Sequence, residues 1–230
     1  ATEPRLSIYE HYVDDLFRRQ QHVRSAEVEE LLGMAQDTFA QVENTAEVLA
    51  NAEIPFRPAK TGSGEEIPVS QGNFEALRQS ADRELRRTAY ESYTDGYLAY
   101  KNTLASSYVT SIKRDVFLAR ARRFDTALEA SLFENNIPLE VFHNLVDTFR
   151  KNIPTWHRYW AIRRKALGVE TLQPYDIWAP IAKNEHRVDY EQSVEWISEG
   201  MKPLGDEYVS ILRKGTLEDR WVDVYPNQCK

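Results

Sequence analysis

The sequence has few of the features that support covalent or membrane-bound functions. Cys229 is the only cysteine, so no disulfide can form within the chain and a reducing compartment is permitted. No apolar run approaches the ~20 residues that a membrane span needs. The opening residues ATEPRLSIYE contain no basic segment followed by an apolar signal region. These absences argue against a membrane protein and a disulfide-stabilised domain, and they favour a cytoplasmic location.

Recognisable catalytic motifs are also missing. No two histidines have the i, i+4 spacing of an HExxH zinc helix, and no G-x-S-x-G is present. Cys229 has no local motif that marks a nucleophile. Gly62 and Gly64 lie between short apolar pairs, not between a strand and a helix, so they do not predict a phosphate-binding loop. The histidines stand at positions 11, 22, 143, 157 and 186.

Basic residues are outnumbered, which limits the kinds of partner. Lys and Arg number 29 against 36 Asp and Glu, which gives a formal charge of −7 and makes nucleic acid an unexpected partner. At 230 residues, with 42% hydrophobic and 28% charged residues, the chain resembles an ordinary globular protein with a real core.

The most informative stretch carries an apolar and aromatic stripe at steps of three or four. This spacing predicts one long helix that resumes at about Gly72, breaks near Ser80 and runs to about Phe124, with a bend at Gly96. The stripe consists of Tyr90, Tyr93, Tyr97, Tyr100, Leu104, Tyr108, Ile112 and Val116.

Two helices and a hairpin are predicted before this stretch. The spacing from Leu6 to Gln20 predicts the first helix, and Ser25 is a plausible N-cap for a second helix, with a break near Gly33. Three prolines and two glycines between Ala52 and Ser70 exclude a helix there and favour a small two-stranded hairpin.

More helices are predicted after the tyrosine stretch. A short helix should cover Asp125 to Phe133, and Pro138 marks the entry to a long helix that ends at Leu167-Gly168 and kinks at Pro154. An extended connection should follow from Thr171 to Arg187. The last helix should run from Tyr190 to about Leu212, bend at Pro203, and end at the run Arg213-Lys214-Gly215.

The predicted fold class is therefore mainly α: an elongated multi-helix assembly with one small β-hairpin near residues 54–69. The hairpin is the best candidate for a boundary. We expect an N-terminal helical lobe with the β-hairpin at 1–80 and the first part of a larger helical domain at 81–230.

Three groups of residues deserve a functional interpretation beside a structural one. Glu140 and His143 have the Glu-x-x-His spacing of di-iron bundles, but such a centre needs a second copy and two further carboxylates. The segment TWHRYWAIRRKALG could bind an anion through its aromatic residues Trp156, Tyr159 and Trp160 and its basic residues Arg158, Arg163, Arg164 and Lys165. Packing by the tryptophans, with the basic residues complementing the helix C-terminus, is the stronger interpretation. The tyrosines could line a cleft, although packing is the commoner role.

The amino-acid sequences of several segments resemble those of the oligoendopeptidase F family of zinc metallopeptidases, a thimet-type group. The segments are REL-RR-AYESY from Arg83, KRDVFLARARRFDTALEASLFENNIPLEVFHNLV from Lys113, HRYWAIRRKALG from His157, and PYDIW from Pro174. The resemblance extends from about Ser25 to Lys230.

This resemblance implies a mostly helical peptidase with a deep channel that cleaves oligopeptides. In the family, zinc is held by two His of an HExxH helix and a downstream Glu, and that helix comes well after the equivalent of Pro226. We therefore expect the N-terminal portion of a parent peptidase, supplying a lobe and channel wall. The chain should have no catalytic, cofactor-binding or metal residues of its own and should be inactive alone.

The partners implied by the resemblance are an oligopeptide substrate and the missing C-terminal catalytic portion, with no nucleic acid and no membrane. Both termini could be cuts in a longer polypeptide. Two alternatives stay open: a non-catalytic helical binding module or companion subunit, and a cofactor-bearing bundle that uses Glu140 and His143.

Overall fold

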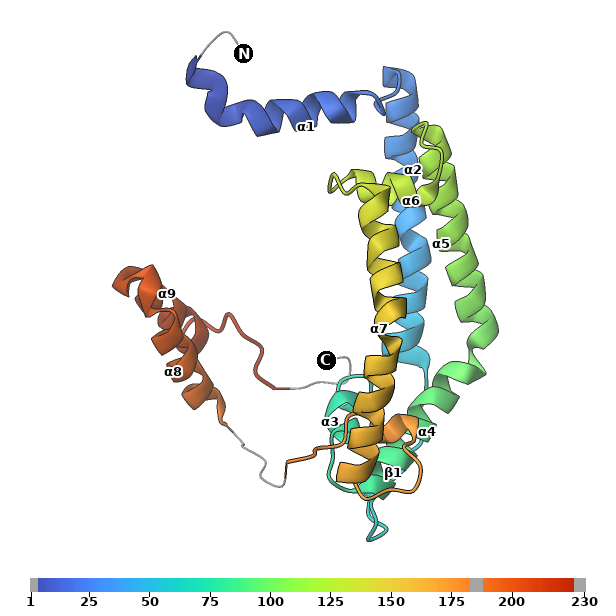
Figure 1. Cartoon of the computed structure of the whole chain (residues 1–230), viewed down its shortest axis with the longest axis vertical. Helices are drawn as coiled ribbons and strands as arrows, with labels where there is room; N and C mark the ends of the chain where they lie inside the picture. Colours follow the sequence, from blue (N-terminus) through green and yellow to red (C-terminus); the bar gives the residue numbers. More distant parts are fainter. Residues whose placement is uncertain (1–3, 183–187, 226–230) are drawn as a thin grey trace. The chain divides into compact units, whose positions relative to one another are not determined.

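The computed structural model describes residues 4–182 and 188–225 (Figure 1). The chain is mainly α with a two-stranded sheet, as predicted. It divides into two compact units: unit 1 comprises Ala1–Glu53 and Leu98–Arg158, and unit 2 comprises Ile54–Tyr97 and Tyr159–Lys230. The predicted domains 1–80 and 81–230 stay a prediction.

Unit 1 begins with a 3-10 turn, Pro4–Tyr9, followed by α1 (Glu10–Gln20). Next, α2 (Ala26–Val48) ends in a π-helical turn at Leu49–Glu53 and lies beside α5 (Lys101–Ala121) (Figure 1). The Phe39 and Phe117 rings meet at 5.6 Å between these two helices, and Leu32 is buried in α2. The predicted break near Gly33 is wrong, because α2 continues through this residue with open space beside it.

The short helix α6 (Ala127–Phe133) follows α5, as predicted. Its N-cap is Thr126, whose side chain accepts a hydrogen bond from the Glu129 backbone N–H at 3.0 Å. This cap replaces one of the backbone partners that the first turn of a helix lacks. The helix therefore starts two residues later than Asp125.

Unit 2 contains the predicted hairpin. Its strands β1 (Ala59–Lys60) and β2 (Glu66–Ile67) pair antiparallel, with Ala59 opposite Ile67. The short helix α3 (Phe74–Arg78) and the longer α4 (Arg83–Ala99) follow the hairpin. The hydrophobic core of these elements consists of Ala59, Val69, Leu77, Leu85 and Ala89, with Phe56, Ile67 and Tyr93 packed against it.

The tyrosine stripe does not form one helix. Helix α4 ends at Ala99 and α5 starts at Lys101, because Tyr100 has a non-helical backbone with φ −105° and ψ 15°. A single non-helical residue leaves steps of three and four in the sequence almost unchanged, so the pattern could not reveal it. The predicted bend at Gly96 stays a prediction, and α4 continues through this residue. Gly96 is buried inside α4, where it allows Phe56 to approach closely.

Helix α7 (Leu139–Ala166) is the longest helix in the described ranges and runs through Pro154. The predicted kink at Pro154 stays a prediction. The predicted end is confirmed: Gly168 has φ +65°, and the Val169 N–H donates to the Arg164 carbonyl at 3.3 Å. Glycine suits this position because it adopts the left-handed conformation without a Cβ clash.

The predicted last helix is two helices. Helix α8 (Tyr190–Gly200) and helix α9 (Asp206–Leu217) are separated by a 3-10 turn at Lys202–Leu204 that contains Pro203. Gly215 does not end the helix but lies inside α9. A Cβ on this residue would lie 2.2 Å from the Trp221 ring. The close approach of Trp221 explains why this position is glycine.

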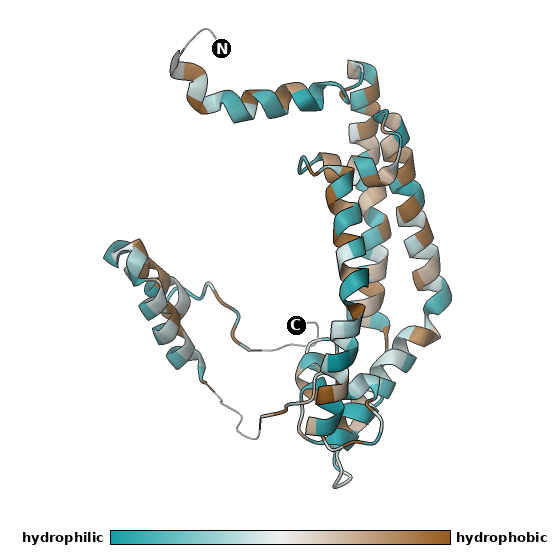
Figure 2. Cartoon of the chain, in the orientation of Figure 1, coloured by the Kyte–Doolittle hydropathy of each residue, from teal (hydrophilic) through white to brown (hydrophobic). Residues whose placement is uncertain are grey.

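Along the helices, hydrophobic and hydrophilic residues alternate in patches (Figure 2). Throughout residues 4–182 and 188–225, no helix is both long and apolar enough to cross a bilayer. The predicted extended connection contains a 3-10 turn at Pro174–Asp176, and its last residues, 183–187, lie outside the described residues.

Candidate functional site

The residues proposed for a metal centre do not come together with further ligands. Glu140 and His143 lie in the first turns of α7, and both are exposed. Within the described part of the chain, no group of three His, Cys, Asp or Glu residues could hold a metal ion. The di-iron hypothesis therefore has no support from these residues. Cys229 and His186 lie outside the described residues.

Two of the tyrosines pack together on α4. The Tyr93 and Tyr97 hydroxyl groups both donate to Gln71 Oε1, at 2.9 Å and 3.0 Å. The Tyr93 ring stacks on Phe74 at 3.8 Å and on Phe56 at 5.2 Å. Burial raises the pKa of Tyr93 to about 12, and the hydrogen bond with Tyr97 adds to this effect. These contacts favour the packing interpretation over a ligand cleft.

Arg163 does not present its guanidinium to an external anion, so the anion-binding alternative is wrong for this residue. Its side chain is buried, and Nη2 donates to the Asp176 carbonyl at 3.3 Å and the Ala179 carbonyl at 2.5 Å. The last turn of α7 therefore uses Arg163 to hold the segment that follows it.

The centre of this arrangement is Asp176, whose side chain is 0% exposed. Arg83 donates to both carboxylate oxygens, from Nε at 3.1 Å and from Nη2 at 2.8 Å. Arg86 Nη2 donates at 3.0 Å and the Gln173 backbone N–H at 3.1 Å. Four donors thus satisfy a buried carboxylate that would be very costly to leave unpaired.

Two opposing effects act on the pKa of Asp176. Burial alone would raise it, but hydrogen bonds from Arg83, the Gln173 backbone and Arg86 stabilise the charged form more strongly. The net effect lowers the pKa of Asp176 below its ordinary value. The carboxylate therefore stays ionised at neutral pH and holds the two guanidinium groups.

The same arginines also donate hydrogen bonds to backbone carbonyls. Arg86 Nε donates to the Tyr175 carbonyl at 3.1 Å, and its Nη1 donates to the Ser80 carbonyl at 2.7 Å. The segment after α7 has little regular structure, so these bonds replace those that a helix or sheet would supply. The Asp176 network, defined here as Arg83, Arg86, Arg163 and Asp176, therefore joins α4, α7 and the PYDIW segment within unit 2.

Sequence reasoning missed the role of Asp176. The sequence predicts for the PYDIW segment only an extended connection and a resemblance to the peptidase family, since a residue between two prolines belongs to no periodic pattern. A single acid amid apolar residues was the only available hint. Its partners lie about ninety positions away, at a separation that no local pattern reports.

In unit 1, the last turn of α1 and the turn that follows it bind the C-terminal ends of α5 and α6. Arg19 Nη2 donates to the Glu134 carbonyl at 3.2 Å, and His22 Nδ1 lies 2.9 Å from the Arg122 carbonyl. Arg18 and Arg24 also donate to carbonyls at these helix ends. Basic groups suit this place because the last carbonyls of a helix are unpaired and carry partial negative charge.

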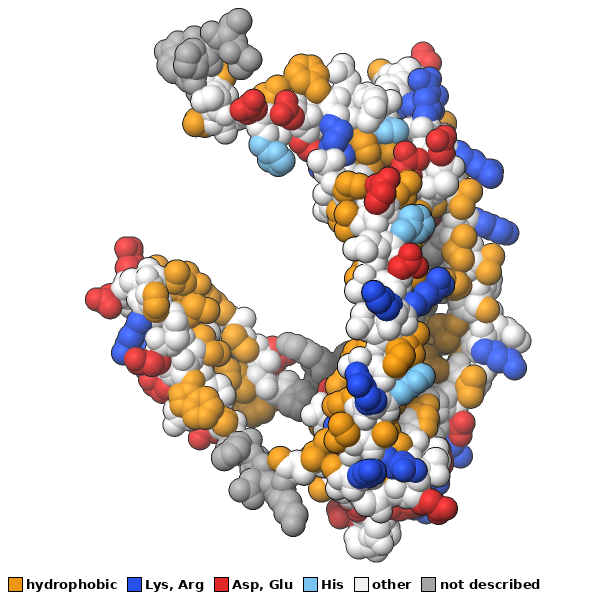
Figure 3. Space-filling model, in the orientation of Figure 1, with side chains coloured by type: hydrophobic (Ala, Val, Ile, Leu, Met, Phe, Trp, Pro, Cys, Tyr) orange, Lys and Arg blue, Asp and Glu red, His pale blue; other side chains and the backbone are white. Residues whose placement is uncertain are grey.

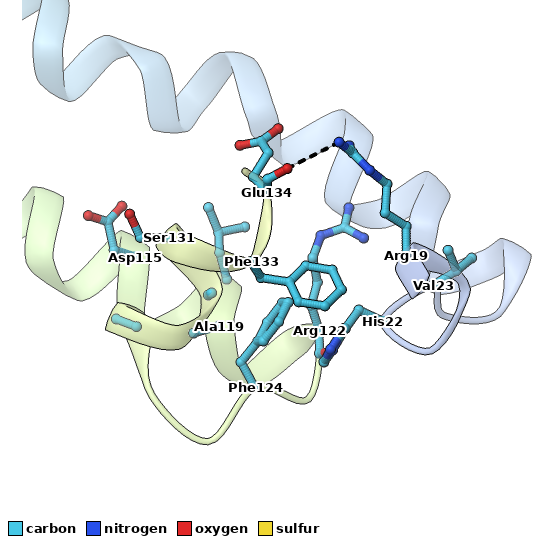
Figure 4. Close-up of a pocket in the computed structure, with 13 residues that line it drawn as sticks. Arg19, His22, Val23, Asp115, Ala119, Arg122, Phe124, Ser131, Phe133 and Glu134 are labelled. Carbon is cyan, nitrogen blue, oxygen red and sulfur yellow. Dashed lines mark hydrogen bonds between the residues drawn. The ribbon is translucent and has the colours of Figure 1, made fainter. Parts of the chain in front are cut away.

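A cavity of about 670 Å³ lies beside this turn (Figure 4). Figure 4 shows Phe124 and Phe133 between Arg19, His22 and Arg122 on one side and Asp115 and Ser131 on the other. The lining residues are Arg19, His22, Val23, Asp115, Leu118, Ala119, Arg122, Phe124, Ala127, Ala130, Ser131, Phe133 and Glu134.

Large apolar side chains also remain exposed on α7. Leu145 is 66% exposed and Phe149, one helical turn further along, is 56% exposed. Hydrophobic side chains are likewise visible on the surface of the α8–α9 pair (Figure 3). Contiguous apolar surface of this kind usually marks an interface.

These observations define a helical protein segment with well-packed local cores and uncovered apolar surface, and comparison with known proteins gives its family. The chain belongs to peptidase family M3: the model of that family matches residues 76–230, and the oligopeptidase F model matches residues 1–56.

Individual proteins similar to this chain carry oligopeptidase names. The chain is 39% identical to oligopeptidase PepF of Bacillus subtilis over 98% of its length, and 33% identical to group B oligopeptidase PepB of Streptococcus agalactiae over 99%. It covers 34% and 38% of these relatives. The crystal structure of oligoendopeptidase-F from Enterococcus faecium is similar with a TM-score of 0.73 and 36% identity, over 92% of this chain and 40% of that one. The chain therefore spans about a third of the length of the relatives it matches.

Proposed function

We propose that the chain is the N-terminal portion of an oligoendopeptidase F-like zinc metalloendopeptidase that hydrolyses internal peptide bonds of oligopeptides. The observation that carries this proposal is the match to two peptidase family models together with relatives that carry oligopeptidase names. In this proposal the chain supplies a lobe and channel wall, the parent acts in the cytoplasm, and its substrate is an oligopeptide.

The residues that the structure describes, 4–182 and 188–225, do not fit a catalytic zinc site. A zinc ion with an open catalytic position needs three protein ligands, and the described residues contain no such group. We therefore derive no catalytic step from this chain and assign the zinc to the C-terminal portion of the parent. The exposed Leu145 and Phe149 on α7 support a large neighbouring portion that would cover them.

The chain alone and the longer polypeptide should behave differently in a hydrolysis assay. With a quenched fluorescent peptide and zinc, the chain alone should show no chelator-sensitive cleavage. The polypeptide encoded by the reading frame continued past Lys230 should contain an HExxH and should cleave the peptide. Robust turnover by the chain alone would contradict the proposal, and so would a continued polypeptide that does not cleave the peptide. A frame that stops at Lys230 would instead favour the companion-subunit alternative.

A further inference from the structure

Exposed basic side chains form a stripe along helix α7. Arg150 and Lys151 are followed seven residues later by His157 and Arg158, and all four side chains are exposed. Seven residues make almost two helical turns, so the two pairs share one face and lie about 10.5 Å apart along the helix. Figure 3 shows Lys, Arg and His side chains gathered over the visible face of this helix. These four residues, all in unit 1, are called the α7 basic stripe.

The cations of the stripe have no acidic partner within the part of the chain that the structure describes. Arg150, Lys151 and Arg158 form no ion pair there. Arg158 Nη2 meets only the uncharged Thr155 Oγ1, at 3.4 Å. The sequence explains this lack, because residues 148–169 contain neither Asp nor Glu. No carboxylate on the second half of α7 can therefore neutralise these side chains.

This positive surface stands on a chain whose formal charge is −7. Other helices balance some of their cations locally: Arg87 pairs with Glu91 at 2.7 Å on α4, and Lys214 pairs with Asp219 at 2.6 Å at the end of α9. Asp147, one turn before the stripe, is the nearest acid along α7, and a single carboxylate cannot balance three cations. An anionic partner would complement the remaining positive charge.

Pro154 adds a hydrogen-bond acceptor between the two basic pairs. It lies inside α7, three residues after Lys151 and four before Arg158, and therefore on the same face. Proline has no N–H, so the Arg150 carbonyl lacks the donor that residue i+4 normally supplies in a helix. A backbone N–H of a bound peptide can donate to this carbonyl. The phosphate backbone of a nucleic acid has no such donor, so the acceptor favours a peptide.

The distance between the basic pairs fits an extended peptide with two carboxylates. Unfolded peptides commonly adopt the polyproline II conformation, in which side chains return to the same side every three residues, about 9.3 Å apart. The basic pairs lie about 10.5 Å apart, and their long side chains can reach across the small difference. Two acidic residues three positions apart would therefore each meet one pair.

We propose that the α7 basic stripe binds acidic oligopeptides in an extended conformation. One carboxylate lies at Arg150 and Lys151, and a second, three residues away in the peptide, lies at His157 and Arg158. A peptide N–H between them donates to the Arg150 carbonyl. That the bound peptide is a substrate of the parent rests on the proposed function. The preference for acidic peptides rests on the stripe alone.

Three peptides blocked at both ends test the preference. They are Gly-Glu-Ala-Ala-Glu-Gly, called the diglutamate peptide, its diglutamine counterpart, and Gly-Ala-Glu-Glu-Ala-Gly with adjacent glutamates. Each is titrated into the chain, and binding is followed by NMR shifts of the α7 backbone amides and the His157 ring protons.

One exposed charge contact is worth at most about fivefold in affinity, so two should favour the diglutamate over the diglutamine peptide by roughly tenfold. High salt should remove most of this difference. The peptide with adjacent glutamates should bind several-fold more weakly than the diglutamate peptide, because only one basic pair is engaged. Equal affinities among the three peptides, or no saturable shifts, overturn the proposal.

A thymidine trinucleotide, which carries two phosphodiesters, tests the other class of anionic partner. At the same ionic strength it should bind more weakly than the diglutamate peptide, because it offers no backbone N–H to the Arg150 carbonyl. Tighter binding of the trinucleotide would make the stripe a nucleic-acid site and would overturn the proposal.

Variants locate the binding. Arg150→Gln combined with Lys151→Gln should remove most of the preference for the diglutamate peptide. Lys101→Gln combined with Lys113→Gln removes two exposed cations from α5 in the same unit, and this matched control should leave the preference unchanged. Asp147→Asn should tighten binding by about twofold, because it removes a like charge beside the stripe. Equal losses in the two double variants, or weaker binding by Asp147→Asn, would contradict the assigned place.

The continued polypeptide separates this proposal from the proposed function, because the binding assay does not use hydrolysis. Binding of the diglutamate peptide at the stripe in both forms, without cleavage of any peptide, would refute the peptidase proposal and retain the stripe. Cleavage without any stripe-dependent binding would refute the stripe alone. Binding by the isolated chain that is lost in the continued polypeptide would show that the added portion covers the stripe, and it would overturn the proposal.

Discussion

At the scale of single residues, Asp176 shows how one buried carboxylate can organise the side chains and backbone around it. It is fully buried and holds Arg83 and Arg86 from a different part of the chain. A buried ion pair contributes little net stability compared with apolar packing, but removal of one partner leaves an uncompensated buried charge. Stability should therefore depend strongly on Asp176.

Asp176→Asn should lower the free energy of unfolding by about 3–5 kcal/mol, because Arg86 would remain buried without a counter-charge. The urea midpoint of unfolding measures this change. Asp95→Asn is the matched control: Asp95 pairs with Arg57 on the surface, where both side chains are more than half exposed, and should cost less than about 1 kcal/mol. Equal losses of unfolding free energy in the two variants would show that burial of the Asp176 network does not increase the cost of removing its carboxylate.

Asp82 illustrates a second use of a carboxylate, at the start of α4. Its side chain accepts hydrogen bonds from the Gly62 N–H at 2.7 Å and the Glu84 N–H at 2.9 Å, and so joins the hairpin tip to the helix. The bond from the Gly62 backbone is the main reason that the pKa of Asp82 lies below its ordinary value; the Leu85 and Glu84 backbone bonds add to it.

The lowered pKa of Asp82 gives a pH dependence with a definite sign. The unfolded chain, with an Asp pKa of about 3.9, binds the proton more readily than the folded chain. The stabilisation is present above about pH 4 and should disappear as the pH falls through the lower folded pKa. Unfolding measured from pH 6 downward should show a smaller acid loss for Asp82→Asn. Asp37→Asn, on the exposed surface of α2, should keep the original slope.

At the scale of elements, two glycines inside helices differ in the space that surrounds them. A Cβ on Gly96 would lie 2.8 Å from ring atoms of Phe56 and 3.0 Å from a methyl group of Ile54, whereas a Cβ on Gly33 would meet nothing within 4 Å. Both positions are helical, so alanine gains about the same intrinsic propensity at each. Only the packing differs.

Gly33→Ala should therefore raise the free energy of unfolding by about 0.5–1 kcal/mol, and Gly96→Ala should lower it by about 1–3 kcal/mol. Thermal and urea unfolding of the two variants measures both changes. If Gly96→Ala stabilised the chain as much as Gly33→Ala, the close approach of Phe56 would not be a constraint on α4.

At the scale of the whole molecule, uncovered apolar surface distinguishes this chain from a self-sufficient domain. Leu145 on α7 is 66% exposed, whereas Leu85 in the core of unit 2 is 7% exposed. If a further portion of the parent covers α7, as we propose, Leu145 contributes stability only when that portion is present.

In the isolated chain, Leu145→Ala should change the free energy of unfolding by less than about 0.5 kcal/mol, and Leu85→Ala should cost about 2–5 kcal/mol. In the continued polypeptide, Leu145→Ala should cost more than it does in the isolated chain. Chemical denaturation of both forms tests this. A large loss at Leu145 in the isolated chain would show that it already belongs to a local core.

The sequence by itself determined the positions of most helices and of the hairpin, because helical periodicity, prolines and glycines are local properties. It also indicated the peptidase family, because the distinctive sequence segments are local as well. It gave the end of α7 at Gly168 correctly, since the cause lies in that residue. It could not show the interruption at Tyr100 or the division of the last helix.

Only the tertiary structure decided which residues face each other across long stretches of chain. Asp176 meets Arg83 and Arg86, and His22 meets Arg122, at separations of about ninety to a hundred residues. Such contacts depend on how helices pack and on which charges become buried, and neither is encoded in a local pattern. The physical reason is that a side chain becomes buried only when the chain folds. The free energy of a buried charge therefore depends on the partners that the folded structure places around it.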